Sequence, residues 1–211
     1  MKKFAYLYVC DTMADWEPGY VISELHSGRY FKEKTLKYEV KTVGLTTNPI
    51  TTMGGVKILP DLTIQKLTTH GAGLLILPGG DTWLEPLHTP VFPKVREFLA
   101  GHIPVAAICG ATLGLAANGF LDDHKHTSND LEYMKALCPT YSGESFYQHQ
   151  PAVVDGDLVT ASGVAALDFA YAILKKLEVF LPATLDAWYK LYQTHDAVYF
   201  FALMNSLPRA E

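Results

Sequence analysis

The sequence predicts an α/β fold, a doubly wound sandwich in which a mostly parallel central sheet carries helices on both faces. Short apolar runs alternate with amphipathic helical patterns along most of the chain. Residues 73–77 are continuously apolar, as is typical of a parallel strand that is covered on both faces. The 211 residues contain no linker-like stretch, so a single domain over residues 1–211 is expected.

The first part of the chain predicts strands at residues 4–9, 38–43 and 73–77 and helices at about residues 20–29 and 90–101. Residues 47–59 carry Gly54 and Gly55 and predict a short hairpin. Asp61 follows, and we expect it to cap a small helix.

Residues 104–119 predict a strand, a sharp turn and a helix in direct succession. The strand ends at Cys109, small residues flank the cysteine, and Asn118 and Gly119 end the helix. This is the layout of a nucleophile elbow with cysteine in place of serine. The N-terminus of the helix favours the thiolate, which is the reactive form of cysteine. A buried structural cysteine is the alternative.

The second part of the chain predicts a short strand at residues 125–128 and a helix at 130–137. A strand pair at 152–154 and 158–161 surrounds a turn, and Ser162 and Gly163 then open a helix over about residues 164–179. Residues 182–208 form a C-terminal extension of one or two amphipathic helices, which cover the core or form a subunit interface.

Several polar, acidic or glycine residues follow the predicted strands, where open α/β sheets bind their ligands. They are Glu17, Gly79, Gly80, Cys109, Ser162 and Gly163. Paired glycines after a strand let backbone N–H groups point at a ligand oxygen, although a plain turn explains them equally well. For Glu17 the alternative is a carboxylate placed favourably at a helix N-terminus.

Composition excludes several classes of function. The net charge of −5 and the scattered basic residues predict no nucleic-acid partner. No apolar run reaches the roughly 18 residues of a membrane span, so no membrane partner is expected. Three widely spaced cysteines favour a reducing compartment, and we expect a cytoplasmic protein. No metal-ligand spacing or phosphate-binding loop occurs, so neither a metal nor another cofactor is predicted.

Four motifs, taken together and in this order, resemble the ThiJ/PfpI family of the class I glutamine-amidotransferase-like superfamily. They are Ala14-Asp15-Trp16-Glu17, Leu77-Pro78-Gly79-Gly80, Ala107-Ile108-Cys109-Gly110 and Val159-Thr160-Ala161-Ser162-Gly163. The resemblance covers about residues 4–177. It implies a flavodoxin-like sandwich, a reactive Cys109 and a protonated Glu17 that shares a hydrogen bond with the thiol. It also implies an oxyanion hole formed by the N–H groups of Gly80 and Gly110, and a homodimer.

The sequence departs from the family at one position. Many members carry a histidine near the thiol, and the ungapped match places Asn129 there. An asparagine orients a substrate or a water but does not act as a general base. His126 is the alternative base, but an odd offset along a strand points it away from Asn129 unless the chain bends.

Three functions follow from the resemblance. The first is a cysteine-dependent hydrolase of the amidase, peptidase or deglycase type, acting on a small molecule or a peptide. The second is an oxidative-stress sensor or chaperone without enzymatic activity, in which Cys109 is oxidised to a sulfinic acid that Glu17 stabilises. The third is a glutaminase subunit that serves a separate synthetase. Cys10 and Cys138 are expected to be inert.

Overall fold

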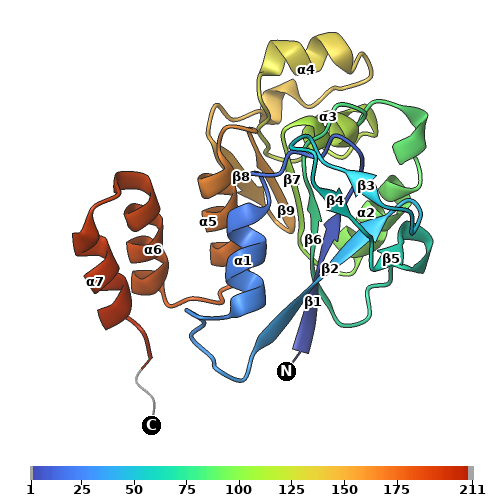
Figure 1. The fold of residues 1–211 in the computed structure, drawn as a ribbon. Helices are drawn as coiled ribbons and strands as arrows, with labels where there is room; N and C mark the ends of the chain where they lie inside the picture. The colour runs from blue at the N-terminus through green and yellow to red at the C-terminus, as the bar shows by residue number, and fades with distance from the viewer. Residues whose placement is uncertain (1, 209–211) are drawn as a thin grey trace.

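A computed structural model describes residues 2–208, and its centre is a seven-stranded sheet (Figure 1). The strand order is β5-β2-β1-β6-β7-β9-β8, and every pair is parallel except β8 with β9. The strands are β1 (Lys2–Tyr8), β2 (Lys37–Gly44), β5 (Leu62–Thr63), β6 (Ala72–Leu77), β7 (Val105–Ile108), β8 (Ala152–Asp155) and β9 (Leu158–Ala161). The predicted mostly parallel sheet is therefore confirmed.

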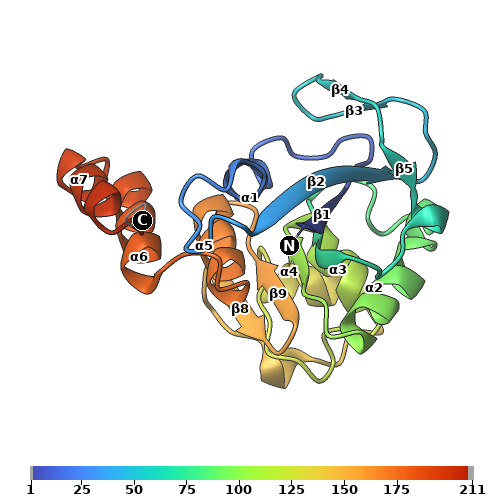
Figure 2. The same ribbon diagram turned by 90° about the horizontal axis from the view of Figure 1, so that it is seen from below.

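Helices cover both faces of this sheet. The helices of the described residues are α1 (Gly19–Ser27), α2 (Val91–Ala100), α3 (Gly110–Ala117), α4 (Leu131–Leu137), α5 (Ala166–Lys176), α6 (Pro182–Thr194) and α7 (Ala197–Asn205), with short 3₁₀ helices at Ile64–Lys66, Pro86–His88 and Glu144–Phe146. Helices α1 and α5 pack together on one face, and α2 and α3 lie on the other (Figure 2). Strands β6 and β7 lie between these layers, which explains why their sequences are almost entirely apolar.

A separate antiparallel hairpin, β3 (Ile50–Thr51) with β4 (Lys57–Ile58), confirms the predicted turn and stands out at the edge of the molecule in Figure 2. The hairpin is attached to the loop that follows β1. The Thr12 N–H donates to the Thr51 carbonyl at 2.9 Å. The Asp15 carboxylate accepts from the Thr52 hydroxyl at 2.6 Å. The hairpin thus holds the loop that leads to Glu17.

Three local predictions were wrong. Asp61 does not cap a helix, because its carboxylate accepts from the backbone N–H and the hydroxyl of Thr42 on β2. Residues 125–128 do not form a strand and make only an isolated bridge at His126. The helix expected from residue 164 begins at Ala166, because the Ala165 N–H closes a turn with the Ser162 carbonyl.

The C-terminal extension consists of two helices, and α6 lies between α7 and the rest of the molecule (Figure 1). Trp188 of α6 is fully buried, and its indole N–H donates to Glu24 of α1 at 3.0 Å. Helix α7 has apolar side chains on its outer side, among them Phe200 and Phe201, which are exposed. The extension is therefore attached through α6.

Candidate functional site

Cys109 lies in the sharp turn between β7 and α3. Its backbone has φ 58° and ψ −126°, in the region that disfavours side chains with a Cβ atom. Such a conformation costs on the order of 1–3 kcal/mol and persists only where the surroundings hold it. Here the Cys109 N–H donates to the Ala161 carbonyl on β9 at 3.0 Å, and the Cys109 carbonyl accepts from the Thr112 hydroxyl at 2.6 Å. The turn has the geometry of a nucleophile elbow.

Glycines allow the backbone to approach this turn closely. A Cβ atom on Gly79 would lie 2.7 Å from the Cys109 Cβ atom, and one on Gly163 would lie 2.7 Å from the sulfur. A Cβ atom on Gly110 would lie 2.6 Å from the Gly80 carbonyl oxygen. Carbon atoms do not approach so closely without displacing a neighbour, so each of these positions requires glycine. Gly80 itself has ordinary space around it.

Glu17 is fully buried beside the thiol. Its Oε2 atom accepts from the Gly79 N–H at 2.5 Å, whereas Oε1 has no hydrogen-bond partner among residues 2–208. A Cβ atom on Gly163 would lie 2.7 Å from the Cys109 sulfur and 3.1 Å from Oε1, so the sulfur and Oε1 are neighbours. Burial raises the pKa of Glu17, and the Gly79 hydrogen bond opposes this. A proton on Oε1 would satisfy that atom by donating to sulfur.

The pKa of the Cys109 thiol is raised above its ordinary value, chiefly by burial. The hydrogen bond from Asn129 lowers the pKa, the Glu17 carboxylate raises it, and the Gly110 N–H lowers it. This direction is opposite to the one expected from the helix N-terminus alone. In this protein the loss of hydration outweighs the favourable end of α3.

Asn129 contacts the thiol directly. Its Nδ2 atom lies 3.2 Å from the Cys109 sulfur, and its Oδ1 atom accepts from the Gly163 N–H at 2.8 Å and faces the Ser162 hydroxyl at 3.5 Å. The amide orientation follows from these partners, because only the NH₂ end can donate to sulfur. Asn129 thus joins the loops that follow β9 and β7.

His126 lies away from this group. It is fully buried, with Nε2 at 2.7 Å from the Tyr141 hydroxyl and Nδ1 at 2.6 Å from the His124 carbonyl. Burial lowers the pKa of His126, which keeps the ring neutral. The structure therefore brings Glu17, Cys109 and Asn129 together and leaves His126 in a different environment.

The glycine loop between β6 and α2 is anchored by residues that the sequence reasoning missed. The Trp83 indole N–H donates to the Pro78 carbonyl at 2.8 Å, and the Asp81 N–H donates to the Thr12 hydroxyl at 2.9 Å. The Thr82 hydroxyl lies 2.8 Å from Nε2 of His88. These contacts fix the backbone of Gly80 beside Gly110. The tryptophan three residues after the glycine pair was the only sequence feature that could have indicated them.

His88 is fully buried, and its Nδ1 atom lies 2.8 Å from the Tyr8 hydroxyl on β1. Its ring stacks on Trp83, with ring centroids 4.7 Å apart. Burial lowers the pKa of His88 to about 4, so the ring is neutral at physiological pH. Within residues 2–208, no group of three or more His, Cys, Asp or Glu side chains is arranged to hold a metal ion.

Comparison with known proteins shows that this chain is similar to members of one family along nearly its whole length. The profile of the DJ-1/PfpI family matches residues 3–176. The uncharacterized protease YoaZ of Bacillus subtilis strain 168 is 54% identical over 204 residues, which are 97% of each chain. The structure of a thiJ/pfpI family protein from Bacillus anthracis has a TM-score of 0.95 at 52% identity and covers 99% of both chains. A DJ-1 superfamily protein from Agrobacterium tumefaciens has a TM-score of 0.80 at 32% identity, covering 92% of this chain and 98% of its own.

Proposed function

Because the chain belongs to the DJ-1/PfpI family, we propose that it is a cysteine-dependent hydrolase of the amidase, peptidase or deglycase type. The observation that carries this proposal is the Cys109 elbow, whose sulfur contacts Asn129 and lies beside the buried carboxyl of Glu17. The name of the relative YoaZ, an uncharacterized protease, supports the same class of reaction.

In the proposed reaction, Cys109 and Glu17 share a proton. When the proton is on Glu17, the sulfur is a thiolate and attacks the substrate carbonyl carbon. The S–C bond forms, the carbonyl electron pair moves to oxygen, and the N–H groups of Gly80 and Gly110 donate to that oxygen. The proton on Glu17 then passes to the leaving group as its bond to carbon breaks. Water hydrolyses the resulting thioester and restores the thiol.

Asn129 has a positioning role in this proposal. Its amide is held by the Gly163 N–H and therefore presents Nδ2 to the sulfur in one orientation. Ser162 and Gly163 form the adjoining edge of the substrate site. The unusual feature is an amide in place of an imidazole, so proton transfer depends on Glu17.

The test is hydrolysis of a panel of small amides, esters and peptides by the purified protein. Cys109→Ser and Cys109→Ala are expected to reduce the rate to that of the buffer, because both remove the thiolate. Cys138→Ala is the matched control, since Cys138 is a buried free thiol on the other side of α3 that donates to the Leu113 carbonyl. Full activity in Cys109→Ser would contradict the proposal.

A second candidate function is an oxidation sensor, with or without chaperone activity. The amide at position 129 favours it, since an asparagine cannot act as the general base of a hydrolase. Here the Cys109 thiolate attacks peroxide, an S–O bond forms and hydroxide leaves. A second peroxide gives the sulfinic acid, which Glu17 stabilises by hydrogen bonding. Mass spectrometry of peroxide-treated protein tests this, and equal oxidation of Cys10 and Cys109 would contradict it.

A homodimer and a cytoplasmic location complete the proposal. Light scattering on the purified protein measures the mass of the particle, and a monomer at working concentration would remove the dimer from it. No helix within residues 2–208 has the length and hydrophobicity to cross a bilayer. Fluorescence microscopy of a tagged chain in its own cells tests the location.

A further inference from the structure

A groove runs along α1 toward α6 and has a cavity volume of about 630 Å³. Its lining residues on the α1 side include Trp16, Tyr20, Ser23 and Ser27, which recur every three or four positions and so form one face. Tyr192 of α6 forms the opposite wall. The ring of Tyr20 contacts that of Tyr192, and the C-terminal extension therefore completes the groove.

One end of the groove lies at the candidate site. Trp16 is 54% exposed and lines the groove, and its indole N–H donates to the Gly163 carbonyl at 3.1 Å. A Cβ atom on Gly163 would lie 2.7 Å from the Cys109 sulfur. The next residue after Trp16 is Glu17. Gly163 therefore joins Trp16, at this end of the groove, to the thiol.

The walls of the groove are aromatic. The rings of Tyr20 and Tyr192 meet edge to face with their centroids 5.0 Å apart. Arg29 lies at the far end, and its guanidinium donates to the buried carboxylate of Glu24. The charge of Arg29 is thus compensated within the protein. The hydroxyls of Ser23 and Ser27 donate to carbonyls of their own helix. The largest side chains available to a ligand are therefore the aromatic ones, which complement another aromatic ring.

We propose that this groove binds an aromatic side chain of an extended peptide whose carbonyl group is presented to Cys109. The inference rests on the proposed function and narrows its substrate class to peptides. Helix α1 has nine residues and is therefore about 13 Å long, which equals about four residues of extended peptide. The cavity volume lies in the range that is usual for ligand sites, roughly 300–1,000 Å³.

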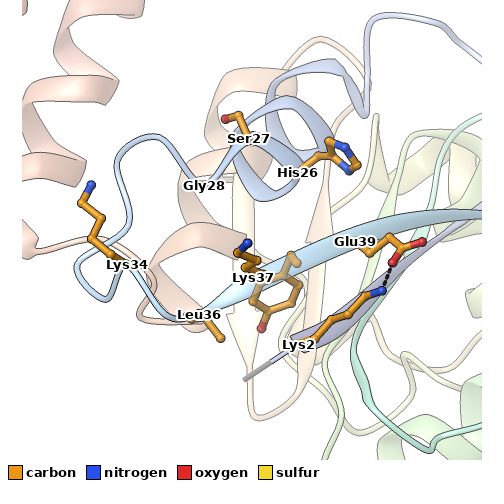
Figure 3. A pocket seen from close by; sticks show the side chains of 9 residues that line it. Lys2, His26, Ser27, Gly28, Lys34, Leu36, Lys37 and Glu39 are labelled. Carbon is orange, nitrogen blue, oxygen red and sulfur yellow. Dashed lines mark ion pairs between the residues drawn. The ribbon is translucent and has the colours of Figure 1, made fainter.

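The flank of α1 that faces β2 provides a control position. His26 points toward β2, where the Val40 N–H approaches its Nδ1 atom at 3.5 Å. Figure 3 shows His26 at a different cavity of about 590 Å³, which is lined by Lys2, Lys34 and Lys37. Lys2 and Lys37 begin β1 and β2, so this cavity lies at the opposite end of the sheet from Cys109. A bulky residue at 26 therefore leaves the groove open.

The test uses iodoacetylated tetrapeptide amides with one phenylalanine at each position in turn and glycine elsewhere. The Cys109 sulfur bonds to the probe's methylene carbon and iodide leaves. Mass spectrometry of the labelled protein therefore measures the rate of alkylation. Each rate is divided by that of iodoacetamide on the same variant. At least one phenylalanine probe is expected to label Cys109 about tenfold faster than the all-glycine probe, since burying a phenylalanine ring yields at least that factor. Ser23→Trp, which fills the groove, is expected to abolish the advantage, and His26→Trp to retain it.

The proposal is overturned if no phenylalanine probe exceeds the all-glycine probe, or if the advantage survives in Ser23→Trp. A Cys109 no more reactive toward iodoacetamide than Cys10 and Cys138 would instead count against the proposed function. In that case, peptide binding to the groove is measured independently of the thiol, by fluorescence anisotropy of fluorescein-labelled tetrapeptides. Preference for phenylalanine in the unmodified chain and in His26→Trp, but not in Ser23→Trp, supports the groove. Equal binding of all peptides contradicts it.

Discussion

At the scale of single residues, the site holds a carboxyl group in a position that is unfavourable for its charge. Glu17 is fully buried, and its Oε1 atom has no partner within residues 2–208. Buried polar atoms in native proteins are normally paired, so an exception beside a thiol points to function. The stability of the protein should therefore improve when this charge is removed.

We expect Glu17→Gln to be more stable than the unmodified protein near neutral pH. Burial raises the pKa of Glu17 from 4.5, so the folded state retains a proton that the unfolded chain releases. Stability is thus lost as the pH rises above 4.5, and glutamine does not titrate. Thermal denaturation at about pH 7 and about pH 4 checks this, and the difference should vanish at the lower pH. A variant that is less stable at both values would contradict it.

The apparent pKa of Cys109 should move in opposite directions in two variants. Asn129→Ala removes a donor to sulfur and is expected to raise the pKa, whereas Glu17→Gln removes a neighbouring negative charge and is expected to lower it. The pH dependence of iodoacetamide alkylation, read peptide by peptide, measures both. Cys10 is the internal control, because burial raises its pKa to about 12. Shifts in the same direction for both variants would refute this account of the thiol.

Sequence reasoning brought together part of the candidate site but not its energetics. The matched motif placed Asn129 at the thiol, and the structure finds it 3.2 Å from the sulfur. The rise in the Cys109 pKa was missed because it is caused by burial of the thiol. That burial depends on Gly79 and Gly163, which follow other strands and lie against the turn. His88 was missed for a similar reason, since its partners lie on β1 and in the glycine loop.

At the scale of elements, the loop after β6 and the start of α3 form one unit around Trp83. A Cβ atom on Gly114 of α3 would lie 2.7 Å from the Trp83 ring, and the same indole donates to the Pro78 carbonyl. The N–H groups of Gly80 and Gly110 belong to these two elements. Their relative position therefore depends on Trp83.

Trp83→Phe keeps an aromatic ring but removes the hydrogen bond to Pro78 and leaves a small cavity at this buried position. We expect a loss of about 2–3 kcal/mol in the free energy of unfolding, from the lost hydrogen bond and the lost packing together. The hydrolysis rate should fall more than the alkylation rate of Cys109, because only hydrolysis requires the two N–H groups to converge on an oxygen. Urea denaturation and the two rate measurements check this. An equal fall in both rates would indicate that the tryptophan acts on the thiol alone.

Local patterns predicted the elements well where the local sequence decides the structure. The apolar run of β6 and the helix predicted at residues 130–137, which is α4 in the structure, are examples. The prediction for Asp61 was wrong because Thr42, on a neighbouring strand, competes for its carboxylate. The predicted strand at residues 125–128 was wrong because, within residues 2–208, the segment pairs only through an isolated bridge between His126 and Tyr147.

At the scale of the whole molecule, a buried carboxylate joins the C-terminal extension to the α/β sandwich. Glu24 of α1 accepts from the Trp188 indole of α6 and from Arg29. Residues so far apart in the sequence are not paired by any local pattern, so the groove between α1 and α6 was not predicted. An extension of one or two amphipathic helices was predicted, and the structure has two.

Arg29→Ala leaves the buried carboxylate of Glu24 with the indole as its remaining side-chain donor. We expect a loss of about 2 kcal/mol in stability, less than the roughly 3–5 kcal/mol of a fully buried pair because the Arg29 side chain is 48% exposed. Urea denaturation measures it. Adding Glu24→Gln should recover part of the loss, since the unpaired charge is gone. If the double variant is less stable by the sum of both single losses, the charges do not interact.

The crowded glycines around Cys109 also limit how this site can change over evolutionary time. A methyl group at Gly79, Gly110 or Gly163 would displace the backbone or the sulfur, so these positions do not accept another residue without a change of structure. Asn129 is exposed and faces the sulfur from the rim. A single base change converts an asparagine codon into one for histidine or aspartate. The shortest mutational path to a different chemistry at this thiol therefore runs through one codon, while the rest of the site stays fixed.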